Sequence, residues 1–211
     1  MLYKTTVAQS TLDLIKLLCK SNCLNDFFLV GGTALSLQIG HRVSIDLDFF
    51  STGSFDVLAL DDELTHAFSF KKLFIESNTV KGTIDGIFID IMSHKYPLIK
   101  PLVFEDNMRM AGINDISAMK LNAIIGSGQR LKDFVDIACL SSFINLNTMI
   151  SAYKSKYGNI NEIIILKALL FFNEIDFEVE IDLAGKPFHW KKIAKRLELM
   201  CNNPDKIFPA V

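Results

Sequence analysis

The chain has 211 residues, 50% of them hydrophobic, and a mean hydropathy of +0.29. This length suffices for one sizeable core, or for a compact core with a helical appendage. Lys and Arg total 22 against 24 Asp and Glu, a formal net charge of −2, which excludes a globally basic nucleic-acid-binding protein and leaves only local basic patches for such contacts.

The sequence contains no segment that predicts export or membrane insertion. Its N-terminus lacks a basic region followed by an apolar run. The most apolar segment, Ile163 to Phe172, is broken by Lys167 and is too short to span a bilayer. Its apolar character on nearly all sides predicts a helix buried among others. Cys19 and Cys23 lack a second pair or a nearby His to complete a zinc site, so we expect reduced thiols, a cytoplasmic location and no membrane partner.

The chain begins with a predicted helix. Apolar residues recur at helical spacing between Thr6 and Lys20, among them Leu12 and Ile15, as is typical of an amphipathic helix. We expect this helix to cover one face of a sheet.

A glycine pair follows the first predicted strand. The apolar residues Phe27 to Val30 indicate a short buried strand, with Gly31 and Gly32 directly after it. Paired glycines permit positive φ angles and a close approach of the backbone to a ligand. Helical spacing from Thr33 to Ile39 predicts a short helix that ends at Gly40. Because a tight turn opening a helix presents free backbone N–H groups, this turn suits a phosphate chain.

Two aspartates alternate along the next predicted strand, Ile45 to Phe50. Strand side chains point to opposite faces in turn, so Asp46 and Asp48 share one face. Carboxylates this close disfavour each other's ionisation, unless a divalent cation such as Mg²⁺ takes both as oxygen ligands. The alternative is a strand whose aspartates face solvent. The combination with the glycine turn and the helix favours the metal and phosphate interpretation.

This order of strand, Gly-Gly turn, helix and Asp-x-Asp resembles the nucleotidyltransferase signature of the polymerase-beta-like superfamily. The segment GGTALSLQIGHRVSIDLDFF, residues 31–50, is more closely similar to the AbiEii/AbiGii family. The members of this family are nucleotidyltransferase-like toxins of abortive-infection toxin–antitoxin systems. The resemblance implies phosphate contacts by the glycine turn and by the Arg-x-Ser ahead of the Asp-x-Asp, that is by Gly31, Gly32, Thr33, Arg42 and Ser44.

A helix and three strands come next. Ser54 is the expected N-cap of a helix that runs to about Phe70. Strand-like segments follow at 72–77, 79–84 and 87–93. Asp85-Gly86 between the last two predicts a tight hairpin turn, and we expect a mixed sheet that is largely buried on one side.

A single charge interrupts the last of these strands. Asp90 lies among Ile, Phe and Met, where a carboxylate is costly unless it is exposed, paired or bound to a cation. Transfer assisted by two metal ions uses a third carboxylate beside such an Asp pair, and the family resemblance implies that it lies on a later strand of the same sheet. Asp90 fits this role. The alternatives are an edge strand with one wet face, or Asp85 as the third acid, which the turn already explains.

The segment His94 to Met110 contains two prolines and little periodicity, so it is predicted to be a connection. It divides the chain into a catalytic core, residues 1–100, and a mainly helical region, residues 101–211, that completes the active site. Helical patterns in this region cover 115–124, 131–143, 147–157, 161–172 and 188–200.

Charged residues in the second of these helices allow two interpretations. On spacing alone, Asp133 and Asp136 share a face and Lys132 lies four residues before Asp136, as on a solvated helix with an internal ion pair. The phrase AMKLNAIIGSGQRLKDFVDI, residues 118–137, resembles instead the second signature of AbiEii-type proteins, which closes over the nucleotide. The resemblance implies that Lys120 neutralises triphosphate charge. It also gives one of the two aspartates a role as base, or as structural partner of Arg130 and Lys132, and spacing does not rank them.

The last predicted helix carries a basic stripe beside an aromatic residue. A stripe of this kind can hold an RNA backbone, although a solvated helix face is the commoner explanation. Its members are Lys191, Lys192, Lys195 and Arg196, with His189 and Trp190 at the start.

Together these patterns predict an α/β fold with a small mixed sheet. The resemblance implies transfer of a nucleoside monophosphate from an NTP to an acceptor hydroxyl, with Mg²⁺ or Mn²⁺ held by Asp46, Asp48 and Asp90. It further implies a toxin with an RNA acceptor, tRNA-like, and a cognate antitoxin protein as partner. Two alternatives stay open: an inert binding module that keeps the fold, and a metal-dependent phosphohydrolase that uses the same carboxylates on water.

Overall fold

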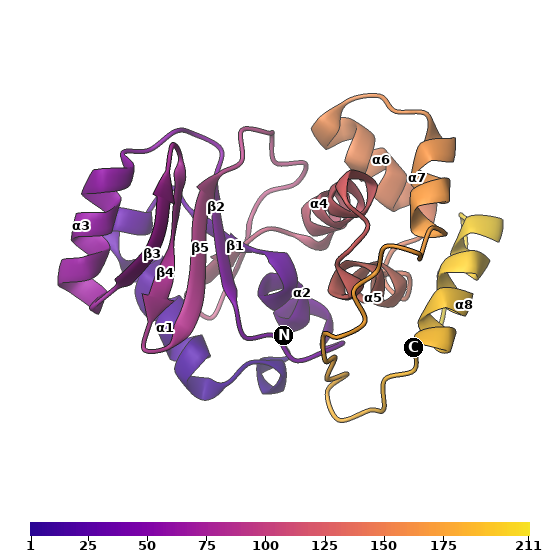
Figure 1. The fold of residues 1–211 in the computed structure, drawn as a ribbon, viewed down its shortest axis with the longest axis horizontal. Coiled ribbons are helices and arrows are strands. Elements are labelled where there is room, and N and C mark those ends of the chain that lie inside the picture. Colours follow the sequence, from indigo (N-terminus) through magenta and orange to yellow (C-terminus); the bar gives the residue numbers. More distant parts are fainter. The chain divides into compact units, whose positions relative to one another are not determined.

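The computed structural model describes all 211 residues, which form two compact units, Met1–Ala111 and Gly112–Val211. The first unit holds a seven-stranded mixed sheet with helices, and the second is built mainly from helices (Figure 1). The predicted α/β class is confirmed.

The sheet has the strand order β3-β4-β5-β2-β1-β7-β6. β2 runs parallel to β5 and β1 parallel to β7, whereas the other neighbours are antiparallel. The predicted strands are present, with β2 beginning two residues later than expected. The strands are β1 (Phe28–Val30), β2 (Leu47–Ser51), β3 (Lys71–Glu76), β4 (Thr79–Ile84), β5 (Ile87–Ser93), β6 (Val103–Glu105) and β7 (Met108–Met110).

Two hairpins of the sheet turn on two successive residues with positive φ. Asp85 and Gly86 have φ angles of 50° and 79°, as the tight turn predicted between β4 and β5 requires. Asp106 and Asn107, with φ angles of 54° and 60°, join β6 to β7 in the same way. The sequence pattern treats this second hairpin as part of a connection, because its three-residue strands are too short to show alternation. It belongs to the first unit, which therefore extends beyond residue 100.

Arg109 on β7 ties the N-terminal helix to the sheet. Its guanidinium donates hydrogen bonds to the backbone carbonyls of Cys19, Leu24 and Phe27. These carbonyls lie at the end of a helix and in the loop that follows, where backbone acceptors have no helical partner. One side chain thus satisfies three of them.

The helices of the first unit differ from their predictions mainly at their starts. α1 (Gln9–Lys20) begins after a short 3₁₀ turn, η1 (Lys4–Thr6), and is followed by another, η2 (Asn22–Leu24). α2 spans Gly31–Ile39 and ends at Gly40, with φ of 67°, as predicted. α3 (Val57–Phe68) packs against β3 and β4. Its N-cap is Asp56, which accepts from the N–H groups of Leu58 and Ala59, so the prediction of Ser54 as cap is wrong.

The helices of the second unit are arranged around α4. It packs against α5, α6 and α7, and α5 packs against α8. No helix of the structure is long and apolar enough to cross a membrane. The five helices are α4 (Ile113–Gly126), α5 (Leu131–Leu140), α6 (Leu146–Tyr157), α7 (Glu162–Leu169) and α8 (Trp190–Asn202).

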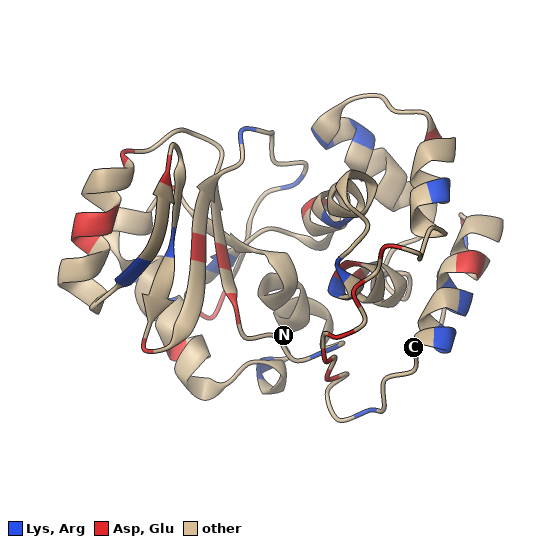
Figure 2. Cartoon of the chain, viewed as in Figure 1, with Lys and Arg blue, Asp and Glu red and all other residues tan.

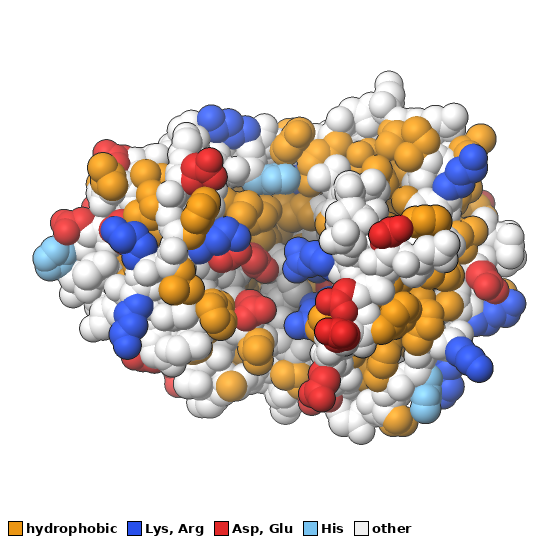
Figure 3. Space-filling view, in the orientation of Figure 1, with side chains coloured by type: hydrophobic (Ala, Val, Ile, Leu, Met, Phe, Trp, Pro, Cys, Tyr) orange, Lys and Arg blue, Asp and Glu red, His pale blue; other side chains and the backbone are white.

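The prediction that the apolar segment around α7 is buried is wrong. α7 buries Ile165 and Leu169, whereas Ile163 is 55% exposed and Phe171, just past the helix, 49% exposed. Figure 3 shows apolar side chains on the surface of the second unit. A helix that is apolar on all sides does not specify which side packs, and here α4 covers only one of them.

Candidate active site

Asp48 and Asp90 lie side by side in the sheet of the first unit. They are register partners on the parallel neighbours β2 and β5, and Figure 2 shows acidic segments next to each other on these strands. Because register partners point to the same face, both carboxylates lie on one side of the sheet. Leu47 and Phe49 on the other side are completely buried. Asp46 precedes the first residue of β2 and is exposed.

The glycine turn brings the start of α2 against Asp48. Gly31 has a φ of +69°, and a Cβ at this position would collide with Asp48 Oδ2. A Cβ at Gly32 would likewise collide with the guanidinium of Arg42. Glycine is therefore favoured at Gly31 by both its positive φ and the lack of space, whereas at Gly32 a Cβ would require the Arg42 side chain to shift. The N-cap position of α2, Val30, supplies no side-chain acceptor to the first-turn N–H groups, which a phosphate can accept from.

The polar residues expected to touch phosphate instead contact one another and the backbone around the Asp-x-Asp. Thr33 is fully buried, and its hydroxyl is hydrogen-bonded to Ser44 Oγ (2.9 Å) and to the carbonyl of Asp46 (2.5 Å). Arg42 is 3% exposed and donates to the carbonyl of Val43 (3.0 Å). These contacts fix the loop that leads into β2. Their role in binding a nucleotide stays a prediction.

A lysine that sequence reasoning missed pairs with Asp90. Lys81 on β4 is the register partner of Asp90, and its Nζ lies 2.6 Å from Asp90 Oδ2. The signal was present in the sequence, because a two-residue turn at Asp85-Gly86 fixes the register of the whole hairpin. Counting back from the pair Ile84 and Ile87 places Lys81 opposite Asp90.

The donors in this region suit a hard divalent cation. No three His, Cys, Asp or Glu side chains converge on a single position. Mg²⁺, however, is usually held by one or two carboxylates together with water and substrate phosphates. Asp48 and Asp90 supply two carboxylates on one face of the sheet, with Asp46 two residues away in sequence. The residues present therefore fit a Mg²⁺ or Mn²⁺ ion.

The second unit brings Lys120 together with both candidate aspartates. Lys120 Nζ on α4 lies 2.5 Å from Asp133 Oδ1 and 2.9 Å from Asp136 Oδ2 on α5. The side chains of the three residues are 8%, 2% and 0% exposed, respectively. The interpretation of the two aspartates as a solvated helix face is therefore wrong, because a lysine from another helix neutralises them inside the unit.

The two other basic residues of this segment are more accessible. Arg130, with its side chain 68% exposed, has Nε 3.7 Å from Asp133 Oδ2. Lys132 is half-buried. Whether either contacts a nucleotide stays a prediction.

A second buried ion pair, also missed from the sequence, links α4 to α6. Lys156 Nζ lies 2.8 Å from Asp115 Oδ1, with side-chain exposures of 1% and 0%. Nothing in the local pattern of either helix marks this pair. It joins positions 41 residues apart, and it follows only from how the helices pack.

The basic stripe on α8 is divided between surface and interior. Lys191 and Lys192 are exposed, but Arg196 donates to Ser141 Oγ (3.0 Å) and to the carbonyl of Pro209 (2.9 Å). Trp190 packs edge-on against Phe172, with ring centroids 5.1 Å apart. The tryptophan therefore belongs to an aromatic cluster of the second unit.

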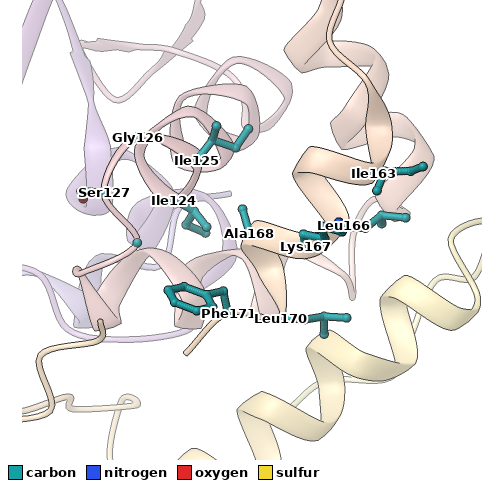
Figure 4. A pocket seen from close by; sticks show the side chains of 11 residues that line it. Ile124, Ile125, Gly126, Ser127, Ile163, Leu166, Lys167, Ala168, Leu170 and Phe171 are labelled. Carbon is teal, nitrogen blue, oxygen red and sulfur yellow. The ribbon is translucent and has the colours of Figure 1, made fainter. Parts of the chain in front are cut away.

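The second unit also has an apolar pocket of about 630 Å³ between the end of α4 and α7. Figure 4 shows Ile124, Ala168 and Phe171 around it. The one charged group in its lining is Lys167, so the pocket lacks the carboxylates that metal-assisted chemistry requires.

Three comparisons show which known proteins this chain is similar to. A family model described as "Nucleotidyl transferase AbiEii toxin, Type IV TA system" matches residues 14–200. The protein aq_aa25 of Aquifex aeolicus (strain VF5) is 33% identical over 175 residues, which cover 80% of this chain and 83% of that protein.

Solved structures show the same fold. The crystal structure of JHP933 from Helicobacter pylori is similar with a TM-score of 0.55 and 18% identity, over 93% of this chain and 92% of that chain. A second H. pylori crystal structure is similar with a TM-score of 0.54 and 17% identity, over 92% and 94% of the two chains. The family match confirms the nucleotidyltransferase class expected from the sequence.

Proposed function

The chain belongs to the AbiEii family of nucleotidyl transferase toxins of type IV toxin–antitoxin systems, and we propose that it transfers a nucleoside monophosphate from an NTP to an acceptor hydroxyl. The reaction releases pyrophosphate and depends on Mg²⁺ or Mn²⁺. The observation that carries the proposal is the placement of Asp48 beside Asp90 on one face of the sheet, with the Asp48 carboxylate against the glycine turn.

Asp48 and Asp90 would hold the divalent cation, and Asp46 lies near enough in sequence to join them. When bound, such a cation neutralises phosphate charge and lowers the pKa of an oxygen nucleophile. Asp48 is kept in position by the close approach of Gly31. In the transfer, the acceptor oxygen would form a bond to the α-phosphorus as the bond to pyrophosphate breaks, and Asp46 or Asp48 would accept the proton that the hydroxyl loses.

The start of α2 would bind the phosphates. Gly31, the first residue of α2, lies against Asp48, and the positive end of the helix dipole favours an anion at this end of the helix. Thr33, Arg42 and Ser44 hold the loop before β2 in place. We assign these three residues to shaping the phosphate site, with Arg42 and Ser44 as further candidate contacts.

In the second unit, Lys120 would supply positive charge for the triphosphate. Asp133 and Asp136 hold its ammonium group from two sides, so both act as positioning residues for the lysine. Arg130 and Lys132, at the start of the same helix, are accessible enough to meet phosphate directly.

We further propose an RNA acceptor and a cognate antitoxin protein as partner. The family description, a toxin of a type IV system, supports both. A toxin that transfers nucleotides needs an acceptor whose modification matters to the cell, and RNA offers terminal hydroxyl groups.

The test uses each NTP labelled at the α-phosphate, with Mg²⁺ and total bacterial RNA. The parent protein is compared with an Asp46→Ala/Asp48→Ala double variant and with Asp85→Asn, which changes an acid in the β4–β5 turn of the same sheet. We expect label in an RNA band with the parent and Asp85→Asn only. Hydrolysed NTP without labelled RNA would indicate a phosphohydrolase, and intact NTP would indicate a protein acceptor or an inert binding module.

A further inference from the structure

We propose that Lys81 is a positioning residue that neutralises Asp90 before the metal ion binds, is displaced from it by the ion, and then faces the phosphates of the substrate. This inference rests on the proposed function, because it concerns the same carboxylates. It adds a residue to which no part of the family signature points.

The geometry places Lys81 in line with both carboxylates. Asp48, Asp90 and Lys81 are successive register partners across β2, β5 and β4. All three side chains therefore lie on the same face of the sheet, with Lys81 Nζ 2.6 Å from Asp90 Oδ2. An ammonium group in this place reduces the repulsion between two adjacent carboxylates.

The exposure of the pair allows exchange. The side chains of Lys81 and Asp90 are 38% and 33% exposed, whereas Lys120 and Lys156, in the buried pairs of the second unit, are 8% and 1% exposed. Breaking an exposed ion pair costs little free energy, because water solvates the separated charges. A lysine on a flexible stem can thus leave Asp90 at small cost and stay within reach of the same face.

A divalent cation and the ammonium group compete for the same oxygens. A carboxylate has enough lone pairs for both, but two positive charges a few ångströms apart repel each other strongly in partly buried surroundings. Binding of the cation at Asp90 therefore drives Lys81 away. The released ammonium lies beside the site where phosphates accumulate negative charge.

A second ion pair of the first unit, between β3 and α3, provides a control. Lys72 on β3 forms an ion pair of 2.7 Å with Asp61 on α3. The side chain of Lys72 is 51% exposed and that of Lys81 is 38% exposed, so both lysines are accessible. Lys72 is the register partner of Gly82, the residue after Lys81 on β4. Because neighbouring residues of a strand point to opposite faces, Lys72 lies on the other face of the sheet from Lys81, Asp90 and Asp48.

The experiment measures Mn²⁺ binding by the electron paramagnetic resonance signal of free Mn²⁺, without nucleotide. Lys81→Met keeps the apolar stem and removes the charge. We expect it to bind Mn²⁺ up to about fivefold more tightly than the parent, the effect of losing one competing ion pair at the surface. Lys81→Arg and Lys72→Met should bind like the parent, and Asp90→Asn more weakly. Equal or weaker Mn²⁺ binding by Lys81→Met would overturn the proposal, as would parent-like binding by Asp90→Asn.

A second measurement examines the released lysine. In the labelling assay, Lys81→Met should raise KM for the NTP several-fold and change kcat less, and Lys81→Arg should restore much of the loss. An unchanged KM for the NTP would contradict the proposal that the displaced Lys81 faces the phosphates of the substrate. If Lys81→Met tightens Mn²⁺ binding while the parent transfers no nucleotide, the displacement stands and the proposed function fails.

Discussion

The two units each hold a group of lysine and aspartate side chains, and the groups differ in burial. In the first unit, Asp48, Asp90 and Lys81 lie on an accessible face of a sheet. In the second unit, Lys120 is enclosed with Asp133 and Asp136. An accessible carboxylate can exchange its partner for a ligand at low cost, whereas a buried one that loses its partner leaves an uncompensated charge. The accessible group can therefore exchange an ion-pair partner for a ligand at low cost, whereas the buried group also contributes to the stability of its unit.

The largest expected effect tests the accessible group. Asp48→Asn should lower nucleotide transfer by roughly a thousandfold or more, since a metal-holding carboxylate contributes several kcal/mol to the transition state. Its melting temperature should stay near that of the parent. Transfer rates and circular dichroism melting, with Asp85→Asn as control, provide the check. Full activity in Asp48→Asn would show that Asp48 is not part of the active site.

A variant of the buried group should, unlike Asp48→Asn, lose stability. Lys120→Met leaves Asp133 and Asp136 without their shared partner, so we expect a loss of about 3–5 kcal/mol in the free energy of unfolding. Urea unfolding measures it, with Lys81→Met as the accessible counterpart, where the loss should be below about 1 kcal/mol. Equal losses in both variants would contradict the distinction between the two groups.

A variant of the second buried ion pair, Lys156 with Asp115, should lose stability and keep its activity. Lys156→Met strands the Asp115 carboxylate in the same manner, and we again expect a loss of about 3–5 kcal/mol in urea unfolding. Because this pair is not among the candidate site residues, transfer by the folded fraction should be nearly unchanged. A large fall in kcat at a temperature where the variant is folded would show that Lys156 contributes to catalysis.

A smaller effect is expected at the glycine turn. Gly31→Ala introduces a Cβ at a φ of +69° and against Asp48 Oδ2, which should cost about 1–3 kcal/mol in unfolding free energy. It should also weaken Mn²⁺ binding by displacing the carboxylate. Gly126→Ala is the control, because a Cβ there meets nothing. Parent-like Mn²⁺ affinity in Gly31→Ala would show that the close approach does not position Asp48.

The smallest effect concerns an ion pair at the surface of the first unit. Hydrogen bonds from Lys16 and then Lys4 lower the pKa of Asp106 from its ordinary 3.8 to about 2. A carboxyl group with a lowered pKa stabilises the fold above pH 3.8, and this contribution disappears as the pH falls toward 2. The difference in melting temperature between the parent and Asp106→Asn should therefore shrink between pH 5 and pH 2. A constant difference would mean that the charge of Asp106 does not contribute.

Local signals in the sequence specified the centre of the first unit. The glycine pair, the Asp-x-Asp and the Asp85-Gly86 turn each act within a few residues, and the structure has the strands and the helix that they predict. The length of this turn also predicts the register of the β4–β5 hairpin, and this register pairs Lys81 with Asp90.

Only the tertiary structure decided which charged and apolar residues are buried. Asp133 and Asp136 look solvated along α5, yet α4 supplies Lys120 to neutralise them. The segment around α7 looks fully buried, yet part of it faces solvent. Periodicity describes one element, whereas burial depends on partners from distant parts of the chain. The sequence alone therefore determined most of the helices and strands and the carboxylate motif, whereas packing determined which charged side chains remain accessible.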